Sequence, residues 1–300
     1  MKGETPSEKE QNVKDDLEKF NERPTIVITG TNGMVGRALL KRLQQTSAWT
    51  VALLRSAVEL PAKQVIVGPF DSPSSAELIK KADYVVHLAG TLFPLDHNSY
   101  HAANVETTQS IVQALKEGGV KRILFLSYVG ADETSKNVYL RTKANAENLL
   151  RGTGKEVIIF RCTHIIGSPE SPGPLAQSML AKPGRKVGIL GRGDQMVAPL
   201  YLRDVVTALI VALKEGKPGT YELGGPDKMT MNDLARLLNR NPELRLSHLP
   251  QWMARGLGTL MPKLLPRPFV EVIIQDSVGD PSHAAHTFGL RLTSLRTIWR

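Results

Sequence analysis

Two side chains whose types and spacing suit acid–base chemistry are Tyr139 and Lys143, in the stretch Tyr139-Leu-Arg-Thr-Lys143. Residues four positions apart lie on one face of a helix. An ammonium group beside a phenol stabilises the phenolate and lowers the phenol pKa, so that such a tyrosine can exchange a proton near neutral pH. Ser127, at the end of a predicted strand, adds a hydroxyl, and these three residues form the candidate catalytic set.

A glycine-rich turn, Gly30-x-x-Gly33-x-x-Gly36, separates a β-branched run over 25–29 from a helical pattern over 37–43. One glycine permits a tight turn, one lets the backbone approach a pyrophosphate, and one lets the helix pack closely on the strand. The start of that helix offers N–H groups to phosphates. The strand–turn–helix context therefore predicts a dinucleotide site. Its members in the turn are Gly30, Asn32, Gly33, Met34, Val35 and Gly36.

The residue after the second predicted strand, 49–54, indicates which dinucleotide binds. An acidic residue there would bind the ribose 2′-OH of NAD, whereas an arginine accommodates the 2′-phosphate of NADP. The sequence reads Leu54-Arg55-Ser56, without an acid. NADP(H) is therefore the favoured cofactor, with NAD(H) as the alternative.

The elements that must position these residues alternate along the chain. Strands are predicted over 25–29, 49–54, 64–67, 84–89, 122–126, 156–160 and 219–223, with helices over 72–81, 99–117, 139–151, 201–213 and 230–238. This order predicts an α/β fold, a Rossmann-like doubly wound parallel sheet with a small C-terminal substrate or lid region. The expected divisions are a flexible N-terminal segment (1–23), an NAD(P)-binding Rossmann domain (24–166) and a loop-rich region (167–300) interleaved with the last sheet elements.

The order of these motifs resembles the short-chain dehydrogenase/reductase superfamily. The segments His87-Leu-Ala-Gly90, Asn104-Val and Gly219-Thr-Tyr-Glu-Leu-Gly-Gly-Pro226 are similar to those of its extended and atypical branches. Those branches include NAD(P)-dependent epimerases and dehydratases and an accessory subunit of respiratory complex I. The resemblance implies a proton role for Tyr139 and a cofactor-gripping role for Lys143. It also implies further cofactor contacts from Phe70, Asp71, Leu88, Ala89, Gly90, Asn104, Thr163 and Ile165.

Two positions depart from the family pattern. Where the family has a Ser-Ser or Ser-Thr pair, this chain has Ser127-Tyr128, and Arg161 is followed by Cys162 instead of proline. Three functions therefore stay open. The first is an NADP-dependent reductase or dehydrogenase that transfers hydride to or from an unidentified small-molecule substrate. The others are a non-catalytic NADPH-binding redox-sensing or assembly subunit, and an epimerase or dehydratase that retains its cofactor.

Composition limits the classes of ligand and partner that the chain is expected to bind. Lys and Arg total 38 against 29 Asp and Glu, a net charge of +9, which favours an anionic ligand. The basic residues are dispersed and no nucleic-acid-binding motif is present. No apolar run is long enough for a membrane span, the histidines lack metal-site spacing, and a lone Cys162 with no secretory signal indicates the cytoplasm.

The apolar and basic segment 247–274 allows two interpretations. It predicts either a lid over the substrate pocket or partner contact, which is favoured, or an interfacial helix on an anionic membrane. The chain is expected to act as a homodimer or beside a partner subunit.

Overall fold

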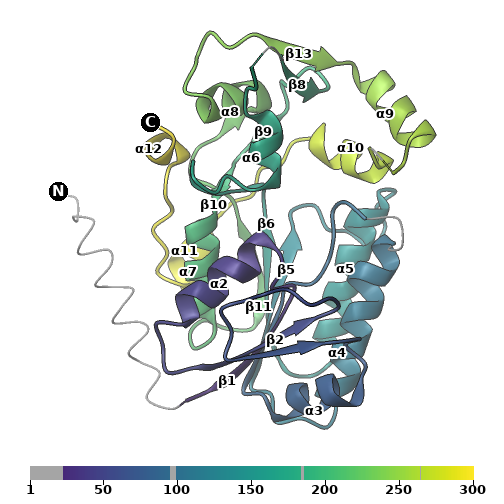
Figure 1. Cartoon of the computed structure of the whole chain (residues 1–300), viewed down its shortest axis with the longest axis vertical. Coiled ribbons are helices and arrows are strands. Elements are labelled where there is room, and N and C mark those ends of the chain that lie inside the picture. The colour runs from purple at the N-terminus through teal and green to yellow at the C-terminus, as the bar shows by residue number, and fades with distance from the viewer. Residues whose placement is uncertain (1–22, 95–98, 184–185, 264) are drawn as a thin grey trace, which may run out of the picture.

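The structure is a computed structural model that describes residues 23–94, 99–183, 186–263 and 265–300. The N-terminal segment predicted to be flexible lies outside the described residues except for Arg23. The centre of the molecule is a parallel sheet of seven strands in the order β11-β6-β5-β4-β1-β2-β3 (Figure 1). The strands are β1 (Thr25–Thr29), β2 (Trp49–Leu54), β3 (Gln64–Val67), β4 (Tyr84–His87), β5 (Arg122–Tyr128), β6 (Glu156–Cys162) and β11 (Gly219–Leu223).

Helices cover both faces of this sheet, which explains why its central strands are apolar without alternation. On one face, α2 (Met34–Leu43) packs against α7 (Leu202–Ala212). On the other lie α3 (Pro73–Lys81), α4 (Thr107–Leu115) and α5 (Val138–Arg151). The strand order reverses between β1 and β4, the position where open α/β sheets bind ligands. The predicted fold class is confirmed.

One predicted helix is interrupted. The sequence predicts a single helix over 99–117, but a π-helical turn, η1 (Ala102–Glu106), precedes α4. Such turns are rare and frequently occur at functional sites. Here the turn carries Asn104, which faces the end of β4 through a hydrogen bond to Thr91.

The C-terminal half contributes β11 and α7 to the main sheet and builds a smaller unit above the carboxyl ends of the strands (Figure 1). That unit contains three strand pairs, β7 (Ile165–Ile166) with β10 (Leu200–Tyr201), β9 (Met196–Val197) with β12 (Met229–Thr230), and β8 (Val187–Leu190) with β13 (Leu246–Leu249). Its helices are α6 (Pro174–Met179), α8 (Met231–Leu238), α9 (Gln251–Leu260), α10 (Arg267–Ile273) and α12 (Leu295–Ile298). The short helix α11 (Ser282–Thr287) instead packs against β11 of the main sheet. Within the region 167–300 that was predicted to be loop-rich, the stretch 167–192 therefore contains α6 and β8.

Candidate functional site

The glycine turn joins β1 to α2 next to the end of β4. Gly30 has φ +69°, and a Cβ there would lie 2.5 Å from the carbonyl carbon of Leu88. A Cβ on Gly36 would lie 2.5 Å from the Cα of Thr31, so this glycine lets α2 pack against the turn. Gly33 donates its N–H to the carbonyl of Gly30 at 3.1 Å and caps α2. Gly30 and Gly36 thus allow the tight turn and the close helix packing that their spacing predicts, and the approach of the turn to a pyrophosphate stays a prediction.

The turn also fits a phosphate-bearing ligand. The hydroxyl of Thr31 is fully buried and has no hydrogen-bond partner among the described residues. Asn32 is exposed, and Met34 and Val35 open α2 without any side chain capping the helix start. A helix start left uncapped in this way offers N–H groups to an anion.

The residues expected around the adenosine half differ in exposure. Arg55 directly follows β2 and is exposed, as the 2′-phosphate role requires. Asp71, which follows β3 in the chain, is also exposed. Phe70, in contrast, is only 6% exposed and packs in the core with Ile79 of α3. Its ring is therefore part of the core and does not line the surface of the expected site.

The end of β4 is held by a directional chain of buried hydrogen bonds through His87. The Thr108 hydroxyl donates to the Asn104 carbonyl at 2.6 Å, so its oxygen is left to accept from Nε2–H of His87 at 2.9 Å. Nδ1 of His87 then accepts from the Thr29 hydroxyl at 2.7 Å, and that oxygen accepts from the N–H of Ala89 at 3.1 Å. Burial lowers the pKa of His87 to about 3, which keeps the ring neutral and this chain intact.

Asn104 ties the end of β4 to the helix that carries the candidate catalytic pair. Its Oδ1 accepts from the N–H of Thr91 at 3.2 Å, and its Nδ2 donates to the hydroxyl of Thr142 on α5 at 3.0 Å. Gly90, with φ +154°, leaves room for this amide, because a Cβ there would lie 2.6 Å from Oδ1. The loop Leu88–Gly90 is therefore fixed beside Lys143.

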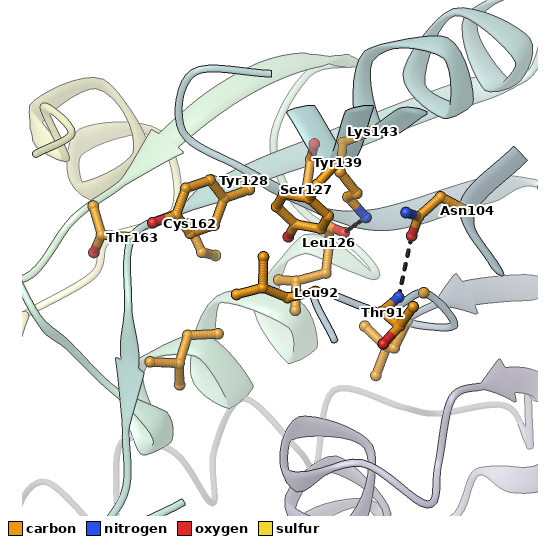
Figure 2. A pocket seen from close by; sticks show the side chains of 13 residues that line it. Thr91, Leu92, Asn104, Leu126, Ser127, Tyr128, Tyr139, Lys143, Cys162 and Thr163 are labelled. Atoms are coloured by element: carbon orange, nitrogen blue, oxygen red, sulfur yellow. Dashed lines mark hydrogen bonds between the residues drawn. The ribbon is translucent and has the colours of Figure 1, made fainter. Parts of the chain in front are cut away.

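Tyr139 and Lys143 line one cavity of about 160 Å³ (Figure 2). Both belong to α5, which begins at Asn137, whose side chain accepts from the N–H groups of Tyr139 and Leu140. The Lys143 ammonium donates to the carbonyl of Leu126 at 2.6 Å and lies 4.1 Å from the centre of the Phe125 ring. The two groups expected to cooperate thus share one cavity.

The pKa of the Tyr139 phenol differs from the expectation. Burial, with Tyr128 and Tyr100 nearby, raises the pKa of Tyr139 above its ordinary value. Burial also lowers the pKa of Lys143 to about 8, against the attraction of Glu147. The predicted lowering of the phenol pKa by Lys143 is therefore wrong for this structure, since desolvation outweighs a lysine whose ammonium is directed at Leu126.

The hydroxyl of Ser127 is engaged by a buried carboxylate. It donates at 2.5 Å to the fully buried carboxylate of Glu147. That carboxylate also accepts from Arg161 at 2.7 Å and Arg151 at 2.8 Å. Ser127 lines the cavity with Tyr139 and Lys143, and its catalytic role stays a prediction that would require its hydroxyl to leave Glu147.

Tyr128 occupies the position where a serine or threonine was expected. Its ring lies edge-on to Tyr139 with 5.7 Å between ring centres. Its hydroxyl is 2.9 Å from Oγ of Ser277 and 3.3 Å from Nδ1 of His164. Burial lowers the pKa of His164 to about 4, so this histidine is neutral, and its Nε2 has no partner among the described residues.

Thr163 and Ile165 line the same cavity, as expected for residues after β6. The Thr163 hydroxyl, however, donates to the carbonyl of Ala198. Burial raises the pKa of Cys162 to about 12, so its thiol stays protonated. Sequence reasoning missed Thr91, Leu92 and Leu126 as cavity residues. Their positions directly after Gly90 and directly before Ser127 were the available signal.

The segment 247–274 contributes no residue to the lining of this cavity, but its Val272 packs with Tyr139 and Tyr128 in one apolar cluster, so the lid over the substrate pocket stays a prediction. Among the residues that the structure describes, no group of three His, Cys, Asp or Glu side chains could hold a metal ion. The same residues include no helix long and apolar enough to cross a membrane.

Comparisons with known proteins agree with this geometry. A model of the NAD dependent epimerase/dehydratase family matches residues 26–224. The chain is 29% identical over 231 residues to NADH dehydrogenase (ubiquinone) 1 alpha subcomplex subunit 9, mitochondrial, of Arabidopsis thaliana, a match covering 70% of this chain and 56% of that protein. It is 25% identical to the NADH-ubiquinone oxidoreductase 40 kDa subunit of Neurospora crassa, covering 88% of this chain and 74% of that protein.

A solved structure shows the same fold. The UDP-glucuronic acid 4-epimerase of Bacillus cereus, in complex with UDP-glucuronic acid and NAD, superposes with a TM-score of 0.69 at 16% identity. The superposition covers 92% of this chain and 96% of that one. The chain itself spans a little over half the length of the Arabidopsis relative.

Proposed function

The chain belongs to the NAD dependent epimerase/dehydratase family, and from that premise we propose that it binds NADP(H) along the carboxyl edge of its sheet and retains it. The proposed site runs from the glycine turn, past Arg55, to Asn104 and Lys143. A nicotinamide cofactor bound there supplies hydride chemistry. The chain's own groups position its phosphates and ribose and exclude water from the buried end at Tyr139.

The size of the cavity supports retention rather than turnover. Pockets for small molecules usually exceed about 300 Å³, whereas the space at Tyr139 and Lys143 is about 160 Å³. A nicotinamide ring in this space would leave little room for a second reactant. The ring of Tyr128 fills the position where the family places a small hydroxyl side chain, and Ser127 is bonded to Glu147.

We also propose that the protein is an NADP(H)-holding subunit of a larger assembly. Two relatives found by sequence are named as subunits of NADH dehydrogenase complexes. In such a subunit, a retained nucleotide would stabilise the fold by linking β1, β2 and α5. Ligands that bind only the folded state raise its stability in this way.

The test is a titration of nucleotide-free protein with NADPH and NADH, followed by nicotinamide fluorescence. We expect NADPH to bind more tightly than NADH. Arg55→Ala should weaken NADPH roughly ten- to hundredfold, as expected for loss of a charge-assisted contact to phosphate, and leave NADH unchanged. Arg23→Ala, at another exposed arginine, is the control. Equal loss of both nucleotides in Arg55→Ala would remove the 2′-phosphate role.

A second candidate function is an NADP-dependent reductase or dehydrogenase. The observation that favours it is that Tyr139 and Lys143 line one cavity, with the pKa of Lys143 lowered to about 8. In this case bound NADPH would be oxidised when a carbonyl substrate is supplied, and Tyr139→Phe would abolish oxidation while leaving binding intact. Turnover without net NADPH oxidation would instead support the epimerase or dehydratase alternative.

A further inference from the structure

A cluster of exposed large apolar side chains lies on and just after α9. Trp252 is 75% exposed and Leu260 is 81% exposed. Met253, Leu257 and Met261 are exposed as well, so five of the large exposed apolar side chains fall within ten residues. Isolated apolar residues on a surface are ordinary, but a contiguous patch of this kind marks a site of interaction. We call these five residues the α9 face.

The packing of α9 fixes which side is exposed. Ala254 and Gly258 are buried, one turn apart, against α10. A Cβ on Gly258 would lie 3.0 Å from the Cα of Arg267, so the small residues allow the two helices to approach closely. The other side of α9 is therefore held outward, at the edge of the molecule away from the seven-stranded sheet (Figure 1).

The charged residues that flank α9 in the sequence are basic. Between Glu243 and Glu271 the sequence has no Asp or Glu, and it carries four cations, Arg245, Arg255, Lys263 and Arg267. Arg255 lies on α9 itself and is exposed. A short helix with exposed Trp and Leu and with nearby Arg or Lys is typical of segments that lie in the plane of a membrane interface.

A second cavity opens beside this face. It has a volume of about 670 Å³ and lies between the start of α5, α9 and α10. Its charged residues are Lys136, Arg255, Arg267 and Glu271. Glu271 is already paired with Arg267 at 2.9 Å, so the lining has an excess of positive charge. Gln251 and Gln275 add amide groups that suit a phosphate-bearing headgroup, whereas the Asn137 side chain is already bonded to Pro268 and to the start of α5.

We propose that the α9 face docks the protein onto an anionic phospholipid bilayer, with the apolar residues in the interface and the adjacent cavity taking a lipid phosphate. The inference is independent of the proposed function, because no residue of the α9 face lines the cavity at Tyr139. An apolar face alone would suit a second copy or a protein partner equally well. The excess of positive charge beside it, which remains after Glu271 is paired with Arg267, favours an anionic bilayer.

The experiment is co-sedimentation of the full chain with vesicles of phosphatidylcholine alone or with 30% phosphatidylglycerol added. We expect binding to the anionic vesicles, with a blue shift of tryptophan emission that is lost in Trp252→Phe. Trp252→Ser combined with Leu260→Ser should weaken binding at least roughly tenfold. Arg255→Gln should weaken it about fivefold and make the remainder less sensitive to salt.

Two control variants match these changes elsewhere on the surface. Trp49→Ser removes another exposed tryptophan, 48% exposed at the start of β2. Arg296→Gln removes an exposed arginine on α12, on the opposite side of the view in Figure 1. Both should bind vesicles like the unchanged protein. Equal loss in the control and α9 variants would overturn the proposal.

Other outcomes also decide against it. Failure of the unchanged protein to sediment with anionic vesicles would overturn it. So would a dimer, measured by light scattering, that the paired Trp252→Ser and Leu260→Ser changes convert to a monomer, because the face would then join two copies. Circular dichroism of each variant establishes that it is folded, so loss of binding is not confused with loss of structure.

Discussion

Lys143 is the residue at which burial has the clearest electrostatic consequence. Its side chain is 5% exposed, and burial lowers its pKa from about 10.5 to about 8. Between these two values the unfolded chain binds more protons than the folded chain, so the free energy of unfolding rises with pH. Below about pH 8 the buried ammonium therefore destabilises the fold.

The first prediction follows for nucleotide-free protein. Lys143→Met should change the melting temperature more favourably at pH 7 than at pH 10, because the penalty it removes has largely disappeared at the higher pH. Thermal unfolding of both proteins at the two pH values measures this difference. Lys116→Met, at an exposed lysine on the helix α4 C-cap, controls for loss of a lysine. A Lys143→Met effect that is the same at both pH values would contradict the account.

Roles that depend on a local sequence motif could be predicted from the sequence. The buried side chains that contact these residues could not. The strand–turn–helix placement of the glycines and the position of Arg55 directly after β2 were predicted correctly, because motifs of this kind depend on backbone positions in local order. The link between Ser127 and Glu147 joins residues twenty positions apart through tertiary packing. No local pattern carries such a contact. The raised pKa of Tyr139 has the same origin, since it depends on rings contributed by η1's neighbour Tyr100 and by Tyr128.

At the scale of elements, the junction of β1, α2 and β4 depends on the absence of a side chain at Gly36. Gly36→Ala should abolish nucleotide binding and destabilise the fold, because its Cβ would meet the backbone of Thr31 and Gly30 at 2.5 and 2.6 Å. Gly119→Ala is the matched control, since a Cβ there would meet nothing within 4 Å. NADPH titration and thermal unfolding of both variants provide the measurement. Normal binding by Gly36→Ala would show that the turn does not hold the dinucleotide.

A second prediction at this scale concerns the buried carboxylate that joins α5, β5 and β6. Glu147→Gln would leave Arg161 and Arg151 without their counter-charge. We expect a loss of about 3 kcal/mol in the free energy of unfolding. Glu117→Gln, in the exposed pair with Lys80, should have a much smaller effect, because solvent screens that pair. Urea unfolding measures both effects. Equal losses in the free energy of unfolding would show that the buried cluster contributes no more to stability than the exposed pair.

Long periodic elements were predictable, and short or irregular ones were not. The strand 219–223 was predicted with the bounds that the structure gives, and β1, β2 and β3 also coincide. The π-helical turn η1 was missed because one extra residue per turn leaves little mark on a hydrophobic period. Strands of two residues, such as β7 and β10, are too short to have a period. The segment after 246 begins with β13, which pairs with β8 across more than fifty residues.

At the scale of the whole molecule, α10 lies between the two surfaces that matter. Its Val272 packs with Tyr139, Tyr128 and Tyr100. Its carbonyl of Pro268 accepts from the side chain of Asn137, the N-cap of α5, at 2.9 Å. The opposite side of α10 supports α9. The nucleotide site and the α9 face are therefore connected through one packed helix.

The central claim is that this protein holds NADP(H), and the most direct measurement is the nucleotide carried by the purified protein. Protein isolated without added nucleotide would be denatured, and the released nucleotides identified and quantified by chromatography. The account predicts NADP(H) in near-stoichiometric amount, absent from Gly36→Ala and reduced in Arg55→Ala. A protein that releases no nucleotide and then fails to bind added NADPH would contradict it, as would recovery of NAD(H) alone in an amount unaffected by Arg55→Ala.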